Sequence, residues 1–207
     1  MGLLILGANT ASGDTIVDVL ERSQQVRLDA LVPVDPESPR AQTVRHSFDT
    51  LVQALHLQET VELRVIRGDT VAETLQGRVV VANESLADWP ETDRQFVLAH
   101  ELGHIVLGHW SQMGLMFQKW VPGMVTQQET DSVAALLGRD ASGLAYRQEF
   151  EADAFAARTM ATLANEPCNV LSVFMRLGAY KDTATHPGTQ RRLAALRSPE
   201  TMPLPGR

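Results

Sequence analysis

The spacing of apolar residues predicts two parts of unequal size along the chain. Residues 3–6, "LLIL", are a short apolar run typical of a buried strand, and the polar turn after them leads into a helix predicted at about residues 14–23. Residues 33–40, "PVDPESPR", contain three prolines and predict a linker or a loop. The sequence therefore predicts an N-terminal strand-helix extension, residues 1–38, followed by a main domain, residues 39–207.

The main domain alternates between patterns typical of strands and of helices. Residues 61–66 alternate between apolar and polar, and residues 77–82, "GRVVVA", contain four consecutive apolar residues, so both are predicted strands. Pro90 and a capping box at residues 92–95 predict the start of a helix that runs to Gly108. These elements predict an α+β domain with a small sheet packed on this helix. Further helices are predicted at about residues 40–56, 127–137, 144–164, 169–177 and 188–197, with Gly138 and Gly178 closing the second and fourth of them.

Composition and charge exclude several classes of protein. The chain has 207 residues, of which 44% are apolar and 21% charged, as expected for an ordinary globular protein. Its formal charge of -7 argues against a nucleic-acid partner, because a groove that follows phosphates needs clustered Lys and Arg. No run reaches the roughly 18 to 20 apolar residues that span a bilayer, and the first residues lack the basic region of a secretory leader. A soluble, cytoplasmic protein is therefore expected, unless the mature form begins elsewhere.

Residues 7–13, "GANTASG", raise the alternative of a non-catalytic regulatory or nucleotide-binding protein. The dinucleotide fingerprint requires glycine where Asn9 and Ser12 stand, and a phosphate loop requires Lys where Asp14 stands. A plain strand-turn-helix unit with Ser12 or Asp14 as the helix cap fits these residues better. The nucleotide-binding role stays open as the alternative.

Residues 100–109, "HELGHIVLGH", place two histidines one helical turn apart. His100 and His104 lie about 40° apart around a helix, so both imidazoles project from one face and can bind one ion. Glu101 lies about 100° from His100, where it can face a metal-bound water but is poorly placed to ligate. Two neutral imidazoles and a carboxylate base are what zinc-assisted hydrolysis requires. A pair of satisfied core histidines is the alternative, and a neighbouring carboxylate makes it a poor one.

His109 is predicted to take no part in this site. The helix period puts it about 140° from His104. A metzincin site would need Gly and His at the positions of Leu107 and Trp110. The favoured role for His109 is that of a polar residue near a helix C-terminus, where the dipole favours positive charge.

The third metal ligand is expected in residues 147–157, "RQEFEADAFAA", on a later predicted helix. Glu149 and Asp153 share a face, whereas Glu151 lies about 200° from Glu149 and is predicted to point outward. If the Glu149 face packs on the histidine helix, Glu149 completes a His2Glu site with a fourth position open to water. Asp153 can then accept a hydrogen bond from a ligand imidazole and fix its tautomer. A solvated acidic helix end is the alternative.

The segments "HELGH", "EFEAD" and "THPGTQRR" resemble the gluzincin metallopeptidases of the HtpX and CAAX prenyl protease group. The resemblance covers roughly residues 40–197, and without a membrane-spanning helix the chain is more similar to the soluble minigluzincins, the reduced catalytic domains of that group. The resemblance implies a zincin-like fold with one zinc per chain. The matching residues are His100, His104 and Glu149 for the zinc ligands, Glu101 for the general base, Asp153 for the acid behind a ligand, and His186 with Arg192 for a C-terminal pair.

The predicted activity is zinc-dependent hydrolysis of peptide bonds in a peptide or protein substrate, which would add as a strand to the sheet edge. His186 and Arg192 are expected either to stabilise an oxyanion or to serve as a helix cap and a salt bridge with Asp153. Regulatory metallopeptidases of the ImmA/IrrE type are the nearest rival, although "THPGTQRR" and the step from His104 to Glu149 favour the first group.

Four features outside these motifs leave alternatives open. The Met-rich residues 113–124 are expected to pack as core under a loop, and the alternative is that they line a cleft or touch a partner or a bilayer surface. Cys168 is the only cysteine, so it forms no internal disulfide, and an inert thiol is favoured over a cap on the zinc. Tyr146 and Tyr180 are weaker candidates for an oxyanion donor.

Overall fold

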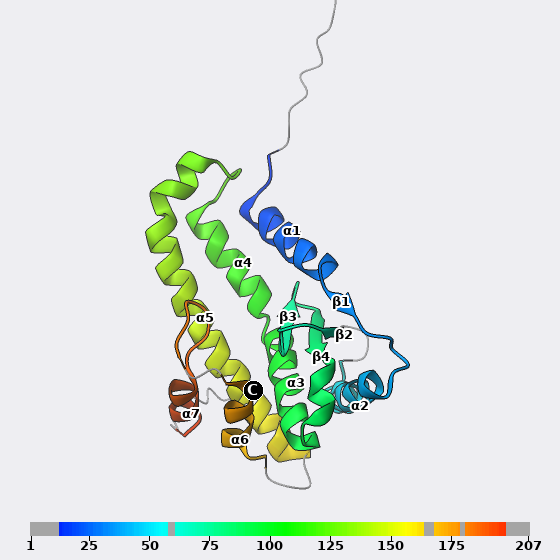
Figure 1. Cartoon of the computed structure of the whole chain (residues 1–207). Helices are drawn as coiled ribbons and strands as arrows, with labels where there is room; N and C mark the ends of the chain where they lie inside the picture. The colour runs from blue at the N-terminus through cyan, green and yellow to red at the C-terminus, as the bar shows by residue number, and fades with distance from the viewer. Residues whose placement is uncertain (1–12, 58–60, 164–167, 179–180, 198–207) are drawn as a thin grey trace, which may run out of the picture.

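The computed structural model describes residues 13–57, 61–163, 168–178 and 181–197, which form a four-stranded sheet with helices on both faces (Figure 1). The predicted strand at residues 3–6 and residues 7–12 of the glycine-rich turn lie outside the described residues. The described elements are α1 (Ile16–Asp29), β1 (Val32–Pro33), α2 (Pro39–Ala54), β2 (Glu62–Arg67), β3 (Ala72–Leu75), β4 (Val79–Asn83), the short 3-10 helix η1 (Glu84–Asp88), α3 (Glu91–Val106), α4 (His109–Trp120), α5 (Gln127–Leu163), α6 (Val170–Leu177) and α7 (Thr189–Arg197).

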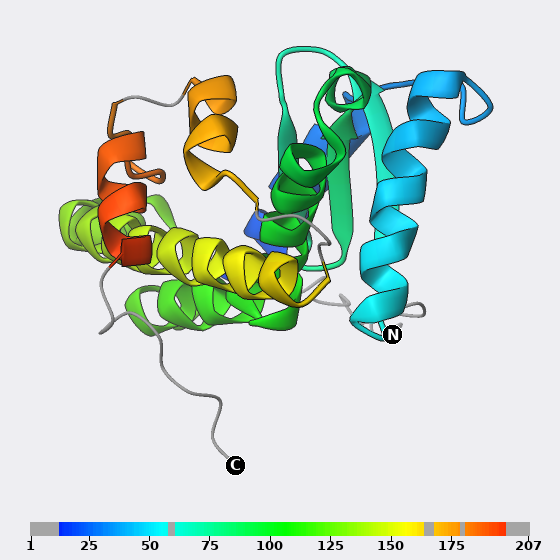
Figure 2. The same cartoon turned by 90° about the horizontal axis from the view of Figure 1, so that it is seen from below.

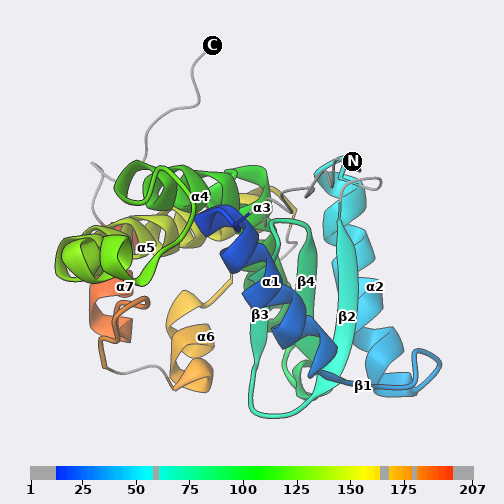
Figure 3. The same ribbon diagram turned by 90° about the horizontal axis from the view of Figure 1, so that it is seen from above.

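The sheet has the strand order β1-β2-β4-β3, with β2 and β4 parallel and the two outer pairs antiparallel. Alternate residues of β4 point to opposite faces: Val80 and Ala82 join a core with α2 and α3, whereas Val79 and Val81 pack with Leu28 of α1. Figure 2 shows α2 and α3 on one side of the strands, and Figure 3 shows α1 across the other. The predicted α+β class is confirmed.

Helix α1 is longer than the sequence predicts and begins at a different cap. Thr15, not Asp14, caps the helix: its hydroxyl accepts a hydrogen bond from the Asp18 N–H, and the Asp18 carboxylate accepts one from the Thr15 N–H. Ser12, the other predicted cap, lies outside the described residues. After the helix, β1 pairs with β2 at the edge of the sheet, and Leu28 of α1 packs on one face of it. Helix α1 and strand β1 are thus both in contact with the sheet. The division of the chain at residue 38 stays a prediction.

The sequence pattern does not predict β3, the strand that borders the histidine helix. It pairs with β4 through a turn at Gln76 and Gly77, whose φ angles of 53° and 63° are typical of a tight hairpin. The predicted strand at residues 77–82 therefore starts too early, because Gly77 belongs to the turn and β4 begins at Val79. A Cβ atom at Gly77 would lie 2.9 Å from the Trp110 Cβ, so the hairpin also needs glycine for space.

Helix α3 carries the paired histidines and ends at Val106, two residues before the predicted end at Gly108, and its N-terminal cap differs from the prediction. Pro90 precedes the helix without a side-chain cap bond, so the capping box predicted at residues 92–95 is wrong. Gly108 adopts the left-handed conformation with φ 67° and ends the helix. The Met-rich residues 113–124 were expected to pack as core under a loop. Up to Trp120 they form part of α4, and Leu115 and Met124 are exposed, so the segment is only partly buried.

Helix α5 runs for 37 residues, so the predicted break at Gly138 is wrong. A glycine inside a helix costs only about 1 kcal/mol, which neighbouring contacts can offset. The C-terminal half of α5 packs closely on α3, since a Cβ at Gly103 would lie 3.3 Å from the Ala152 Cα. Within the described residues, no helix has both the length and the hydropathy needed to cross a bilayer.

Candidate metal centre

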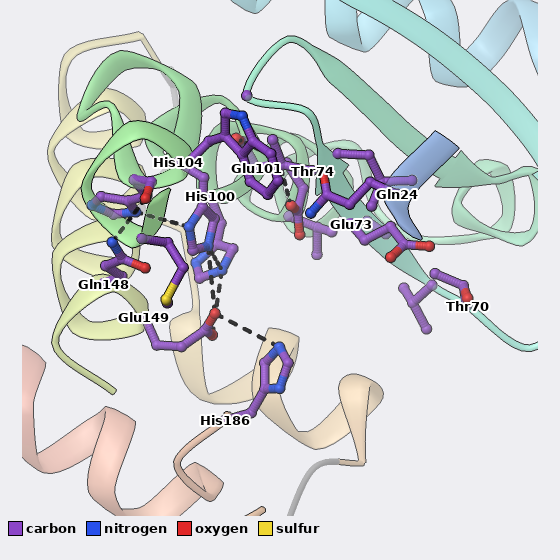
Figure 4. A pocket seen from close by; sticks show the side chains of 18 of the residues that line it. Gln24, Thr70, Glu73, Thr74, His100, Glu101, His104, Gln148, Glu149 and His186 are labelled. Atoms are coloured by element: carbon purple, nitrogen blue, oxygen red, sulfur yellow. Dashed lines mark hydrogen bonds and ion pairs between the residues drawn. The ribbon is translucent and has the colours of Figure 1, made fainter. Parts of the chain in front are cut away.

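Two helices bring the predicted metal ligands together. His100 and His104 project from one face of α3, and Glu149 projects from α5 toward them (Figure 4). The two imidazole Nε2 atoms are 3.2 Å apart, and the Glu149 oxygens lie 3.4 Å from His104 Nε2 and 3.6 Å from His100 Nε2. One ligand atom from each residue lies within 4.8 Å of the others.

These separations fit a zinc ion. Ligand atoms about 2.0 to 2.1 Å from a tetrahedral zinc lie about 3.3 Å from one another, close to the spacing of this set. Glu149 Oε2 is buried and has no hydrogen-bond partner among the described residues. A buried carboxylate oxygen without a hydrogen bond is costly, and a cation bound between it and the imidazoles would reduce that cost.

Asp153 holds His100 from the side away from this centre. Its Oδ1 lies 3.0 Å from His100 Nδ1, and because a carboxylate only accepts, Nδ1 donates and Nε2 keeps its lone pair for a metal. Burial alone would lower the pKa of His100, but the hydrogen bond to Asp153 and the charges of Glu149 and Asp153 raise it. Burial would raise the pKa of Glu149, but the hydrogen bond with His104 and the nearby positive charges hold it well below its usual value. Glu149 is therefore ionised, as a ligand must be.

Arg192 contacts the centre mainly through Asp153. Its Nε donates to Asp153 Oδ2 at 2.7 Å, and its guanidinium stacks on the ring of Phe174. Its Nη1 is 3.7 Å from Glu149 Oε2. The salt bridge between Arg192 and Asp153, one of the two predicted alternatives, is present. Through Asp153, Arg192 helps to hold the His100 ring in place.

His109 lies against His104, so the prediction that it points elsewhere is wrong. The two Nδ1 atoms are 2.8 Å apart, and the second His109 nitrogen lies 3.2 Å from Glu151, whose side chain was predicted to point outward and is 45% exposed. The angle was extrapolated along a helix that in fact ends at Val106, and Gly108 turns the chain before His109. Burial, with the nearby histidines, lowers the pKa of His109 to about 3.

Glu101 is positioned by a residue that the sequence analysis missed. The Thr74 hydroxyl of β3 is 2.8 Å from Glu101 Oε2 and 2.8 Å from the Glu101 carbonyl (Figure 4). Thr74 was missed because β3 itself was not predicted, although the Gln-Gly pair before an apolar run is a weak hairpin signal.

His186 reaches the same centre from a loop before α7. Its Nε2 is 3.7 Å from Glu149 Oε1, and its side chain is 60% exposed (Figure 4). The Tyr146 hydroxyl donates to the Thr183 carbonyl at 2.6 Å and so anchors this loop to α5. Tyr146 thus supports the loop, whereas Tyr180 lies outside the described residues.

The candidate centre lines a cleft of about 710 Å³. Helix α1 and β3 supply one side, where the Gln24 side-chain oxygen accepts a hydrogen bond from the Gln76 N–H and Arg27 lies 2.7 Å from Glu73. Met113 of α4 also lines the cleft, so the Met-rich segment contributes to the site.

Cys168 lies away from the cleft. Its thiol is 3.8 Å from the Thr92 carbonyl, two turns before His100 on α3. Burial, with the charge of Asp93, raises the pKa of the thiol to about 11. A cap on the zinc, the open alternative for this cysteine, does not fit this position.

Comparison with known proteins agrees with this arrangement. Residues 39–200 match the model of Peptidase family M48, a family of metal-dependent peptidases. The matched region contains all seven predicted site residues: His100, Glu101, His104, Glu149, Asp153, His186 and Arg192. No curated protein matches the chain significantly. Since the family model covers well over half of the sequence, the chain belongs to peptidase family M48.

Proposed function

We propose that this chain is a zinc-dependent endopeptidase with one zinc held by His100, His104 and Glu149. The observation that carries the proposal is the convergence of these three ligands, together with a buried Glu149 Oε2 that has no hydrogen-bond partner among the described residues. The donor set of two imidazoles and one carboxylate is typical of catalytic zinc sites, which keep a fourth position open.

Glu101 serves as the general base. Zinc at this site would polarise a peptide carbonyl and lower the pKa of water toward 7. The Glu101 carboxylate takes a proton from the attacking water and passes it to the leaving amine. Thr74 keeps the carboxylate oriented through its 2.8 Å hydrogen bond to Oε2.

The substrate backbone pairs with the open edge of β3. The Asn83 N–H donates to the Val71 carbonyl at 2.8 Å and the Arg78 N–H to the Leu75 carbonyl at 3.2 Å, so the odd-numbered residues face β4. The backbone groups of Ala72 and Thr74 therefore face the cleft side, where an extended peptide can add as a strand.

Within peptidase family M48, we also propose a subgroup for the chain and roles for two further residues. We place the chain with the gluzincins of the HtpX and CAAX prenyl protease group, as a soluble, minigluzincin-like member with a zincin-like fold. His186, exposed beside Glu149, is the residue that contacts a developing oxyanion. Arg192 acts through Asp153 and His100. The cytoplasmic location stays a prediction.

The experiment compares wild type with Glu101→Gln, using Glu91→Gln as the control because Glu91 is exposed at the start of the same helix. Zinc content and cleavage of casein are measured for all three. The expected result is one zinc per chain in each, a loss of activity of about 10² to 10⁴-fold in Glu101→Gln, and unchanged activity in Glu91→Gln. Absence of zinc from folded, unchelated wild type, or full activity in Glu101→Gln, would overturn the proposal.

A further inference from the structure

His109 links a metal ligand to a carboxylate on another helix. It is the first residue of α4 and only 3% exposed, and its two ring nitrogens contact different partners. Nδ1 lies 2.8 Å from His104 Nδ1, and Nε2 lies 3.2 Å from Glu151 Oε2. The row Glu151–His109–His104 thus ends at the candidate zinc centre.

The positions of the hydrogens among Glu151, His109 and His104 follow from which of their atoms can donate and which can only accept. The Glu151 carboxylate can only accept, so His109 Nε2 carries a hydrogen. Burial favours the neutral ring, which has one hydrogen only, so His109 Nδ1 is an acceptor. The hydrogen between the two rings then belongs to His104 Nδ1. Once an ion takes the place of the hydrogen bond between His104 and Glu149, His104 Nε2 is left with its lone pair, and it is this atom that lies 3.4 Å from Glu149 Oε1.

We propose that His109 and Glu151 act together as positioning residues that fix the ring orientation and tautomer of His104 and so raise the metal affinity of the site. The proposal rests on the zinc-binding role of His104 given above. In this arrangement each ligand histidine is oriented by a carboxylate. Asp153 accepts directly from His100 Nδ1, whereas Glu151 acts on His104 through His109.

The backbone of His109 is held independently of its side chain. The Gln148 Nε2 donates to the His109 carbonyl at 3.0 Å, and Gly108 sets the direction of the chain before it. Substitutions of the His109 side chain therefore test its nitrogen contacts rather than the path of the chain. Glu151 is 45% exposed at its side chain, so its removal leaves the core intact.

The test is a double-mutant cycle on zinc affinity, measured by chelator competition with the full chain. His109→Phe keeps a ring but removes both nitrogens, and we expect zinc to bind about tenfold to a hundredfold more weakly. His109→Asn keeps an acceptor near the Nδ1 position and should recover most of the loss. Glu151→Ala should weaken binding less than His109→Phe. Combined with His109→Phe, it should add nothing, because Glu151 acts only through His109.

Asp140→Asn is the matched control, because it removes one negative charge from the same helix at an exposed Arg139 contact. Its zinc affinity should equal that of wild type. Wild-type affinity in His109→Phe, additive losses in the double variant, or an equal loss in Asp140→Asn would overturn the proposal. If His109→Phe does not fold, an unchanged affinity in Glu151→Ala overturns it. Absence of zinc from wild type would instead show that the proposed function has failed.

Discussion

Arg192 and Asp153 form a buried, two-pronged ion pair behind the candidate metal centre. Arg192 Nε donates to Asp153 Oδ2 at 2.7 Å and Nη2 to Oδ1 at 2.5 Å, and the side chains are only 8% and 1% exposed. The same Asp153 carboxylate accepts from His100. The pair therefore links α7 to α5, and it also holds His100, the candidate metal ligand on α3, in place.

Replacing Arg192 by Ala should destabilise the protein by about 3 to 5 kcal/mol, because it leaves the Asp153 charge buried and unpaired. The neighbour Arg191 is the control: it is 63% exposed and pairs with Asp182 at 3.0 Å. Arg191→Ala should cost less than about 1 kcal/mol. Urea unfolding of both variants measures the difference, and equal losses would contradict the structural role given to the buried pair.

Gly103 sets how closely α5 approaches the histidine helix. Its Cβ would lie 3.1 Å from Phe155 Cδ1 and 3.3 Å from the Ala152 Cα, and the backbone cannot yield easily. Gly103→Ala should therefore destabilise by about 1 to 3 kcal/mol and weaken zinc binding, since Glu149 moves with α5. Gly143→Ala, at a helix position with nothing within 4 Å, should stabilise by about 0.5 to 1 kcal/mol. Thermal unfolding and zinc titration check both; a neutral Gly103→Ala would contradict the close packing.

Zinc should stabilise the chain against heat, because it binds the folded arrangement of ligands. At zinc a hundredfold above the dissociation constant the gain is about 2.7 kcal/mol, which raises Tm by roughly 5 to 10 °C for a chain of this size. Glu149→Gln should abolish the zinc-dependent shift, and it should also lower the Tm of the metal-free protein, since the carboxylate charge loses its contacts with His104 and Arg192. Calorimetry with zinc, and with magnesium as a control ion that prefers oxygen ligands, tests this expectation. An equal shift with magnesium would argue against the site.

Thr74→Val should reduce kcat/KM about tenfold to a hundredfold at unchanged zinc affinity. The hydroxyl bond to the Glu101 carboxylate is lost, and a hydrogen bond to a charged group is worth about 1.5 to 3 kcal/mol. Thr74→Ser retains the hydroxyl and should restore most of the activity. Steady-state kinetics of the two variants show whether the hydroxyl orients Glu101. If the substitutions acted by disrupting β3 instead, Thr74→Val and Thr74→Ser would lose activity to the same extent.

Cys168 should react slowly with iodoacetamide in the native protein. Burial and the charge of Asp93 raise its pKa from 9.0 to about 11, so at pH 8 the reactive thiolate is about a hundredfold scarcer than in unfolded chain. Because the thiol loses its proton only as pH rises through the folded pKa, the native rate should keep increasing above pH 9. The rate in urea should level off there. A native rate that also levels off near pH 9 would show an occluded thiol with an ordinary pKa.

The helical periodicity of the sequence was sufficient to predict most of the residues that form the candidate metal centre. The i, i+4 spacings of His100 with His104 and of Glu149 with Asp153 place each pair on one helix face whatever the surroundings. The apolar patterns likewise predicted β2, β4 and α2 to within a few residues. These features depend on neighbours in sequence, so pattern alone could predict them.

The remaining features depend on contacts between distant segments. β3 is a strand because β4 offers it hydrogen bonds, not because of its own pattern, and Thr74 reaches Glu101 only as a result. His109 returns to His104 because Gly108 ends α3 and redirects the chain, and an angle counted along a continuous helix cannot register that change. The sequence by itself determined which side chains share a helix face; the tertiary structure decided which of them meet across helices, because such meetings depend on where each helix ends and how closely the next one packs.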